Sequence, residues 1–116
     1  MKSYNIYVLS FLAICMSFSA KAMQIQHVRD NNGCTINVLN AGTNVFQVSY
    51  NQAGKFAEIR GNTLLICLQN NTVYAYNIAT NSLRLNKKYE NNVTGLHLNG
   101  RTLYVHIGNM AHIETL

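Results

Sequence analysis

Residues 61–85, GNTLLICLQNNTVYAYNIATNSLRL, carry the clearest indication of fold class in the chain. It holds three short runs of apolar or alternating residues, separated by Asn70-Asn71 and Thr80-Asn81. Such runs are typical of strands joined by tight turns, because Asn and Gly accept the backbone conformations that tight turns need. The stretch therefore predicts three consecutive antiparallel strands.

The same pattern extends over the chain from residue 25 to its last residue, and no window has a helical period. The expected strands are residues 25–29, 35–39, 45–50, 56–59, 64–68, 73–78, 83–87, 93–98, 103–107 and 110–116. The sequence thus predicts an all-β, antiparallel meander of eight to ten short strands. Two architectures fit it: β-propeller-like blades, or a small β-sandwich or barrel.

The opening stretch has a partial second copy. Residues 61–68 align with residues 100–107 at an offset of 39, and residues 73–75 align with residues 111–113 at an offset of 38. A period of this size is that of a four-stranded propeller blade. Because a propeller closes with about four to eight blades, we expect blades of this chain to need neighbours from another chain.

Residues 61–85 resemble a blade of the quinoprotein-type (PQQ-like) β-propellers. Blades of that family carry Ala, Asp, Thr-Gly and then a docking Trp, and the corresponding residues here are Ala75, Asn77, Thr80-Asn81 and Leu85. Ala and Thr match, whereas Asn replaces both Asp and Gly, and Leu replaces Trp. The resemblance implies a blade-like scaffold that binds partners, and no quinone or other cofactor is expected.

Two dipeptides predict the last hairpins. A two-residue turn at Asn99-Gly100 would pair Leu98 with Arg101, and one at Gly108-Asn109 would pair Ile107 with Met110. Cross-strand partners share a face. The predicted core face carries Leu96, Leu98, Leu103, Val105, Ile107 and Met110, and the other face carries His97, Thr102, Tyr104, His106 and Ile113. Since both faces hold apolar groups, we expect both to be packed.

The first 22 residues read as a secretory signal. Lys2 precedes the apolar run of residues 6–18, and the A-x-A sequence of residues 20–22 predicts cleavage after Ala22. A lipoprotein signal at Cys15 is disfavoured because Ile14 stands where a small residue is required. We therefore expect residues 23–116 to form a single all-β domain, periplasmic or secreted, without a transmembrane helix.

Two cysteines follow the predicted cleavage site, Cys34 and Cys67. An even pair in an exported protein favours a disulfide. The alternative is two buried thiols.

Charge and spacing argue against several activities. Residues 23–116 hold seven scattered Lys and Arg against four Asp and Glu, a net charge of +3, without the concentrated basic patch of nucleic-acid-binding proteins. The carboxylates are isolated, so we expect no enzyme. One catalytic alternative is a Cys67 nucleophile assisted by His106. The histidines lack metal-ligand spacing, so we expect no metal site.

The candidate interaction residues are Tyr74, Tyr76, Tyr104, His97 and His106. Tyrosine offers apolar area and a hydroxyl group, although sheet packing is its ordinary role. We expect a small exported protein that binds a protein partner or a second copy of itself, as a binding or structural component of a bacterial envelope assembly. The alternatives are a stand-alone periplasmic inhibitor or immunity-type protein, and a carbohydrate-binding module, which the absence of Trp does not favour.

Overall fold

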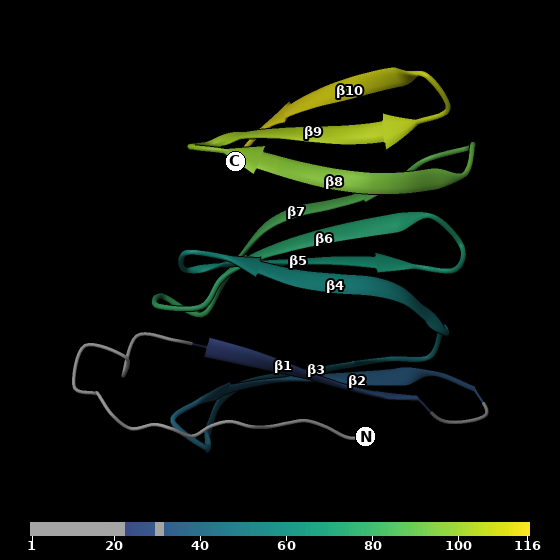
Figure 1. Cartoon of the computed structure of the whole chain (residues 1–116). Helices are drawn as coiled ribbons and strands as arrows, with labels where there is room; N and C mark the ends of the chain where they lie inside the picture. The colour runs from purple at the N-terminus through teal and green to yellow at the C-terminus, as the bar shows by residue number, and fades with distance from the viewer. Residues whose placement is uncertain (1–22, 30–31) are drawn as a thin grey trace.

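The structure is a computed structural model that describes residues 23–29 and 32–116 (Figure 1). Over these residues the chain forms ten strands and no helix. The strands are β1 (Met23–Arg29), β2 (Cys34–Asn40), β3 (Thr43–Tyr50), β4 (Gly54–Arg60), β5 (Thr63–Leu68), β6 (Thr72–Asn77), β7 (Ser82–Lys88), β8 (Val93–Asn99), β9 (Thr102–Ile107) and β10 (Met110–Thr115). The prediction of an all-β antiparallel meander is confirmed. The predicted signal, its cleavage site and Cys15 lie outside the described residues.

The strands form three sheets within this described part of the chain. We call β1–β3 sheet A, β4–β7 sheet B and β8–β10 sheet C. Every paired strand is antiparallel to its neighbour in sequence. The sheets stack face to face, with sheet B in the middle (Figure 1). In the described residues there is also no helix with the length and hydropathy that a membrane crossing requires.

Two buried layers hold the stack together. Layer A/B lies between sheets A and B and contains Ile36, Val38, Leu64, Ile66 and Leu68, and layer B/C lies between sheets B and C and contains Leu65, Val73, Ala75, Leu103 and Val105. Strand β5 contributes to both layers, because successive side chains of a strand point to opposite faces. The unbroken apolar run LLICL at residues 64–68 is therefore the mark of a central strand covered on both sides.

The strand pattern repeats along the chain. A β-bulge at Gly54/Phe56 in the β4–β5 pair recurs at Val93/Gly95 in the β8–β9 pair, and one at Val38/Leu39 in the β2–β3 pair recurs at Ala75/Tyr76 in the β6–β7 pair. Matching the bulges makes β1–β3 equivalent to β5–β7, and β4–β6 equivalent to β8–β10. The 39-residue offset of the sequence repeat is the offset between β5 and β9.

One predicted hairpin register is right and one is wrong. Ile107 pairs with Met110, as Gly108-Asn109 predicts. The other turn is Gly100-Arg101, so Leu98 pairs with Leu103 instead of Arg101. The reason is that Gly100, with φ of 63°, takes the first central position of the turn, as in the hairpins that place Gly there. The shift is by two residues, so the predicted division of sheet C into two faces is kept.

The predicted disulfide between Cys34 and Cys67 is wrong: the structure does not join these cysteines. Cys34 is buried in layer A/B, whereas Cys67 is buried in layer B/C. The physical reason is the alternation along β5, which turns Cys67 away from sheet A and towards sheet C.

Polar side chains hold sheet C on sheet B. The Lys55 Nζ atom of β4 donates hydrogen bonds to Asn71 Oδ1 at 2.7 Å, Asn92 Oδ1 at 2.6 Å and the carbonyl of Val93 at 2.9 Å. Asn71 lies in the β5–β6 turn, Asn92 lies in the connection from β7 to β8, and Val93 is the first residue of β8. A single cation thereby fixes the point at which the chain passes from sheet B into sheet C.

Candidate interaction surface

Two of the candidate tyrosines, Tyr74 and Tyr76, are half-buried on the face of sheet B that packs against sheet A. The ring of Tyr74 lies 4.6 Å from that of Tyr50, and the Tyr76 hydroxyl is 2.7 Å from the Tyr50 hydroxyl. Burial, followed by this hydrogen bond, raises the pKa of Tyr50. Tyr74 and Tyr76 thus contribute to the packing of layer A/B.

The other three candidates, His97, Tyr104 and His106, lie together on the face of sheet C that points away from sheet B. Tyr104 stands on the middle strand β9, where it is paired with His97 on one side and with Ile113 on the other. The rings of His97 and Tyr104 are 6.1 Å apart. We call this surface the open face. Its residues are His97, Asn99, Thr102, Tyr104, His106, Ala111, Ile113 and Thr115.

No part of the chain within residues 23–29 and 32–116 covers the open face, contrary to the expectation that both faces of this sheet are packed. Ile113 is 65 % exposed, and His97, His106 and Ala111 are also exposed. Met110, expected on the core face, is 66 % exposed because it lies at the end of the edge strand β10. The alternation of residues separates the two faces of the sheet correctly, but it does not say what lies over each face.

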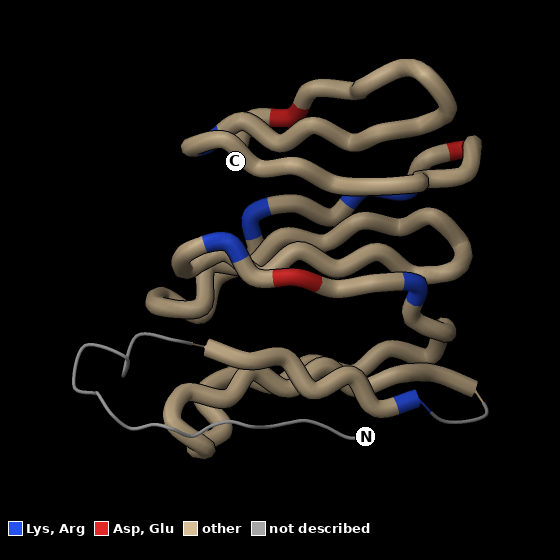
Figure 2. The backbone as a smooth tube through the Cα atoms, viewed as in Figure 1, with Lys and Arg blue, Asp and Glu red and all other residues tan. Residues whose placement is uncertain are grey.

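Charge is absent from the open face as far as the structure describes the chain. None of its residues is Lys, Arg, Asp or Glu. Figure 2 shows that most of sheet C consists of residues other than these four types. On β10 the acidic Glu114 points the other way, where it accepts hydrogen bonds from Lys87 and Tyr89, each at 2.8 Å. The open face therefore offers an aromatic ring, aliphatic groups, imidazoles and hydroxyls, which suits burial against another protein surface.

The outer face of sheet A differs from the open face of sheet C in that most of its side chains are polar. It carries amide and hydroxyl side chains from all three strands, among them Gln24, Gln26, Thr35, Asn37, Gln47 and Ser49. They bond to one another: Thr35 Oγ1 lies 2.9 Å from Ser49 Oγ, and Asn37 Nδ2 donates to Gln26 Oε1 at 3.1 Å. We call this surface the polar face, and it ends the stack in a form that water solvates well.

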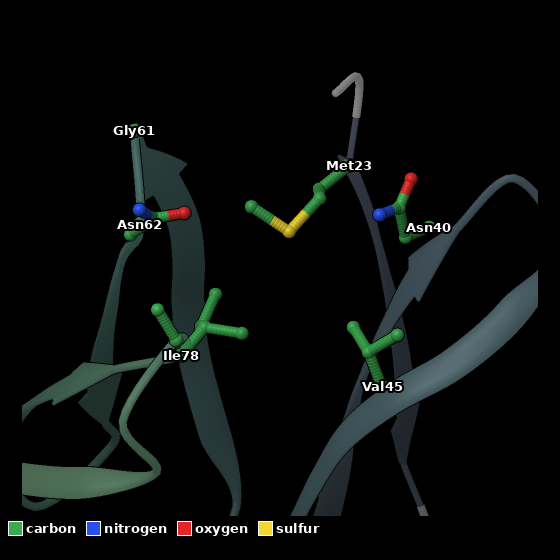
Figure 3. A pocket seen from close by; sticks show the side chains of 7 residues that line it. Met23, Asn40, Val45, Gly61, Asn62 and Ile78 are labelled. Carbon is green, nitrogen blue, oxygen red and sulfur yellow. The ribbon is translucent and has the colours of Figure 1, made fainter. Parts of the chain in front are cut away.

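Shallow hollows open between the described residues at one end of the layers, and two of them have equivalent linings. The first lies between the ends of sheets A and B, where Met23, Asn40 and Val45 face Gly61, Asn62 and Ile78 (Figure 3). The second lies between sheets B and C and is lined by Thr63, Asn77, Arg84, Gly100, Arg101 and Leu116. The six residues of the second hollow are the repeat equivalents of the six just named. The hollows are thus features of the repeated scaffold, and the first is lined without a titratable side chain.

The catalytic pair considered from the sequence does not come together. Cys67 is buried in layer B/C, whereas His106 is exposed on the open face. Burial raises the pKa of Cys67 to about 11, a change that Lys55 partly opposes, so the reactive thiolate is disfavoured at neutral pH. Among the residues that the structure describes, no three His, Cys, Asp or Glu side chains gather as a metal site.

Two further residues were not identified from the sequence: one lies on the open face, and the other holds sheet C on sheet B. Ala111 joins the open face because it pairs with His106, and strand alternation in β10 was the signal that could have shown it. The role of Lys55 had no local signal, since its three partners are distant in sequence. No protein-family model matches the chain, and no curated protein matches it.

Proposed function

We propose that this protein is a small exported β protein, periplasmic or at the cell surface, that serves as a binding or structural component of a bacterial envelope assembly through protein–protein contacts. The observation that carries the proposal is the contrast between the two ends of the stack. One end is the hydrogen-bonded polar face, and the other is the uncharged open face with Ile113 and Tyr104. The polar face also exposes one aliphatic side chain, Val28, but there it lies among amides and hydroxyls, whereas on the open face Ile113 lies beside Tyr104 and Ala111. Adjacent apolar groups left on a surface are typical of an interaction site.

Export is proposed from the predicted signal in residues 1–22. Full-length chain with a carboxy-terminal tag, produced in a Gram-negative host, is expected in the periplasmic fraction with Met23 as its first residue. Amino-terminal sequencing of the purified protein checks this. An uncut chain that stays in the cytosol would contradict export.

The contact surface is tested by photo-crosslinking in cells that contain the natural partners. A photoreactive phenylalanine analogue replaces Tyr104 on the open face or, as the matched control, Gln26 on the polar face. The Tyr104 position is expected to give a discrete crosslinked protein product, and the Gln26 position is not. The absence of a product at Tyr104, or equal products at both positions, would contradict the proposal.

A further inference from the structure

In sheets A and B, the repeat equivalents of the open-face residues are covered by a neighbouring sheet. The bulge and register match makes Tyr104 equivalent to Leu65, Ala111 equivalent to Val73, and Ile113 equivalent to Ala75. Leu65, Val73 and Ala75 are 0 % exposed, because sheet C lies over them in layer B/C. In sheet A the equivalent positions are Ile36 and Val38, which are also 0 % exposed beneath sheet B. At these positions sheets A and B each have another sheet above them.

The surface that covers the open face cannot be the polar face of another molecule, for a physical reason. Stacking the polar face on Tyr104 and Ile113 would bury Gln, Asn, Thr and Ser side chains against an apolar surface. Burying polar groups costs free energy unless new hydrogen bonds replace those to water. The side chains of the polar face already bond to each other across the strands of sheet A, so the fold terminates the stack there.

The open face, by contrast, can meet a copy of itself. Residues 23–116 carry a net charge of +3, so two copies repel each other most where their Lys and Arg side chains meet. The open face contributes no Lys, Arg, Asp or Glu among the described residues, whereas the adjacent sheet B carries Lys55, Arg60, Arg84 and Lys87 on its edge strands. When two open faces approach each other, no Lys, Arg, Asp or Glu side chains of like charge are brought together. Each face can then bury the Tyr104 and Ile113 side chains of the other.

We propose that the partner of the open face is a second copy of this chain, in a two-fold symmetric dimer centred near Tyr104. The inference rests on the proposed function, since it names the partner of the same surface. Such an interface is isologous, the commonest arrangement among soluble oligomers. The resulting stack of six sheets ends in a polar face on both sides, so it closes and does not grow into a filament.

The area of the open face determines how tightly two copies are expected to bind each other. Three strands spaced about 4.8 Å apart and six residues long give a footprint of roughly 300 Å² on each copy, well below the roughly 800 Å² per partner of a standard stable interface. We therefore expect a reversible, concentration-dependent dimer with micromolar affinity.

The proposal is tested by sedimentation velocity on protein purified from cells that express the full chain. The protein concentration is varied over about 5 to 500 µM, a range that brackets micromolar dissociation constants. The wild type is expected to pass from monomer to dimer mass. Tyr104→Lys and Ile113→Lys are expected to stay monomeric. The matched control is Val28→Lys, an exposed β-branched residue on the outer side of sheet A, 47 % exposed; it is expected to dimerise like the wild type. Circular dichroism melting shows that each variant is folded.

A second measurement shows which surfaces meet. Tyr104→Lys and Tyr104→Glu proteins, each monomeric alone, are expected to form a mixed dimer when combined, because a two-fold axis near Tyr104 brings the two positions together. A monomeric wild type, a dimer that survives Tyr104→Lys, or no mixed dimer would overturn the proposal. The photo-crosslink at Tyr104 separates this failure from that of the proposed function: with a monomeric wild type, a product with a different protein leaves the proposed function standing.

Discussion

Layer A/B and layer B/C take equivalent places in the repeat and differ in what fills them. Layer A/B is rich in aromatic rings, with Phe46 packed 5.1 Å from Tyr76 and Tyr50 packed against Tyr74. It also contains the His27 Nε2 atom, buried without a hydrogen-bond partner. The buried side chains of layer B/C are mainly aliphatic, and its polar groups, Lys55 and Glu114, lie where they find partners.

One repeated backbone pattern therefore accommodates two kinds of core, one aromatic and one mainly aliphatic. Where the titratable group lies inside the layer, as His27 does, protonation opposes packing directly. Where it lies at the rim, as Glu114 does, the carboxylate keeps its hydrogen bonds from Lys87 and Tyr89. We therefore expect layer A/B to weaken first as the pH falls, and the predictions below test the two layers against each other.

The largest effect is expected from Leu64→Ala and Leu103→Ala. These residues are repeat equivalents and are both 0 % exposed, Leu64 in layer A/B and Leu103 in layer B/C. Each variant is expected to lose about 2–5 kcal/mol of unfolding free energy in urea. Hydrogen exchange is expected to rise in sheets A and B for Leu64→Ala and in sheet C for Leu103→Ala. Leu83→Ala, at a site 50 % exposed, is the control; equal losses for all three would contradict the prediction.

A smaller loss is expected from Gly54→Ala, at the start of β4. A Cβ atom at Gly54 would overlap the imidazole of His27 and would lie 3.1 Å from Cys34 Sγ. Overpacking of this kind costs about 1–3 kcal/mol, measured as a lower melting temperature. Gly95→Ala is the matched control, because the nearest atom to its Cβ, on His106, is 3.9 Å away. Equal melting temperatures for the two variants would show that layer A/B can yield at this point.

The pH dependence of layer A/B is expected to come from His27. Burial, and then the charge of Arg29, lower the pKa of His27 from 6.5 in the folded protein. The unfolded chain therefore binds the proton more readily, so stability is full above pH 6.5 and falls as the pH drops towards the folded pKa, by at most about 1.4 kcal/mol per pH unit. Urea unfolding of wild type and His27→Gln checks this. The same slope in both proteins would exclude His27 as its source.

The smallest effect is expected from Glu114→Gln in layer B/C. The hydrogen bond from Lys87 is the main cause that lowers the pKa of Glu114, with a further contribution from Tyr89. The stabilisation is therefore present above the unfolded pKa of 4.5 and is lost as the pH falls through the folded value. Glu114→Gln is expected to cost about 1 kcal/mol or less near neutral pH, and nothing in strong acid. Exposed Glu90→Gln is the control; a cost that persists in acid would contradict the charge as its cause.

Much of the fold was predictable because strands alternate and turns have few allowed residues. The run at residues 64–68 marks the central strand, and Gly108-Asn109 marks the last hairpin. The turn at Gly100 was placed one residue early, since both Asn and Gly suit such turns and the sequence does not say which of them takes the first central position.

The stacking of the sheets was not predictable by the same means. Alternation says which residues share a face, as it does for Tyr104 and His106, but not which sheet covers that face. Cys34 and Cys67 illustrate this limit: both are buried, but they lie in different layers. Two of the five candidate surface residues, Tyr74 and Tyr76, were likewise on a face that another sheet covers.

The unbroken order of the meander has a consequence for the folding rate. Each strand of sheets A, B and C pairs only with a strand next to it in sequence, so no paired strands are separated by a long loop. Closing short loops costs little entropy, and proteins dominated by local pairings fold faster than β proteins with distant pairings. We therefore expect the chain to fold faster than β proteins of similar size whose paired strands are distant in sequence.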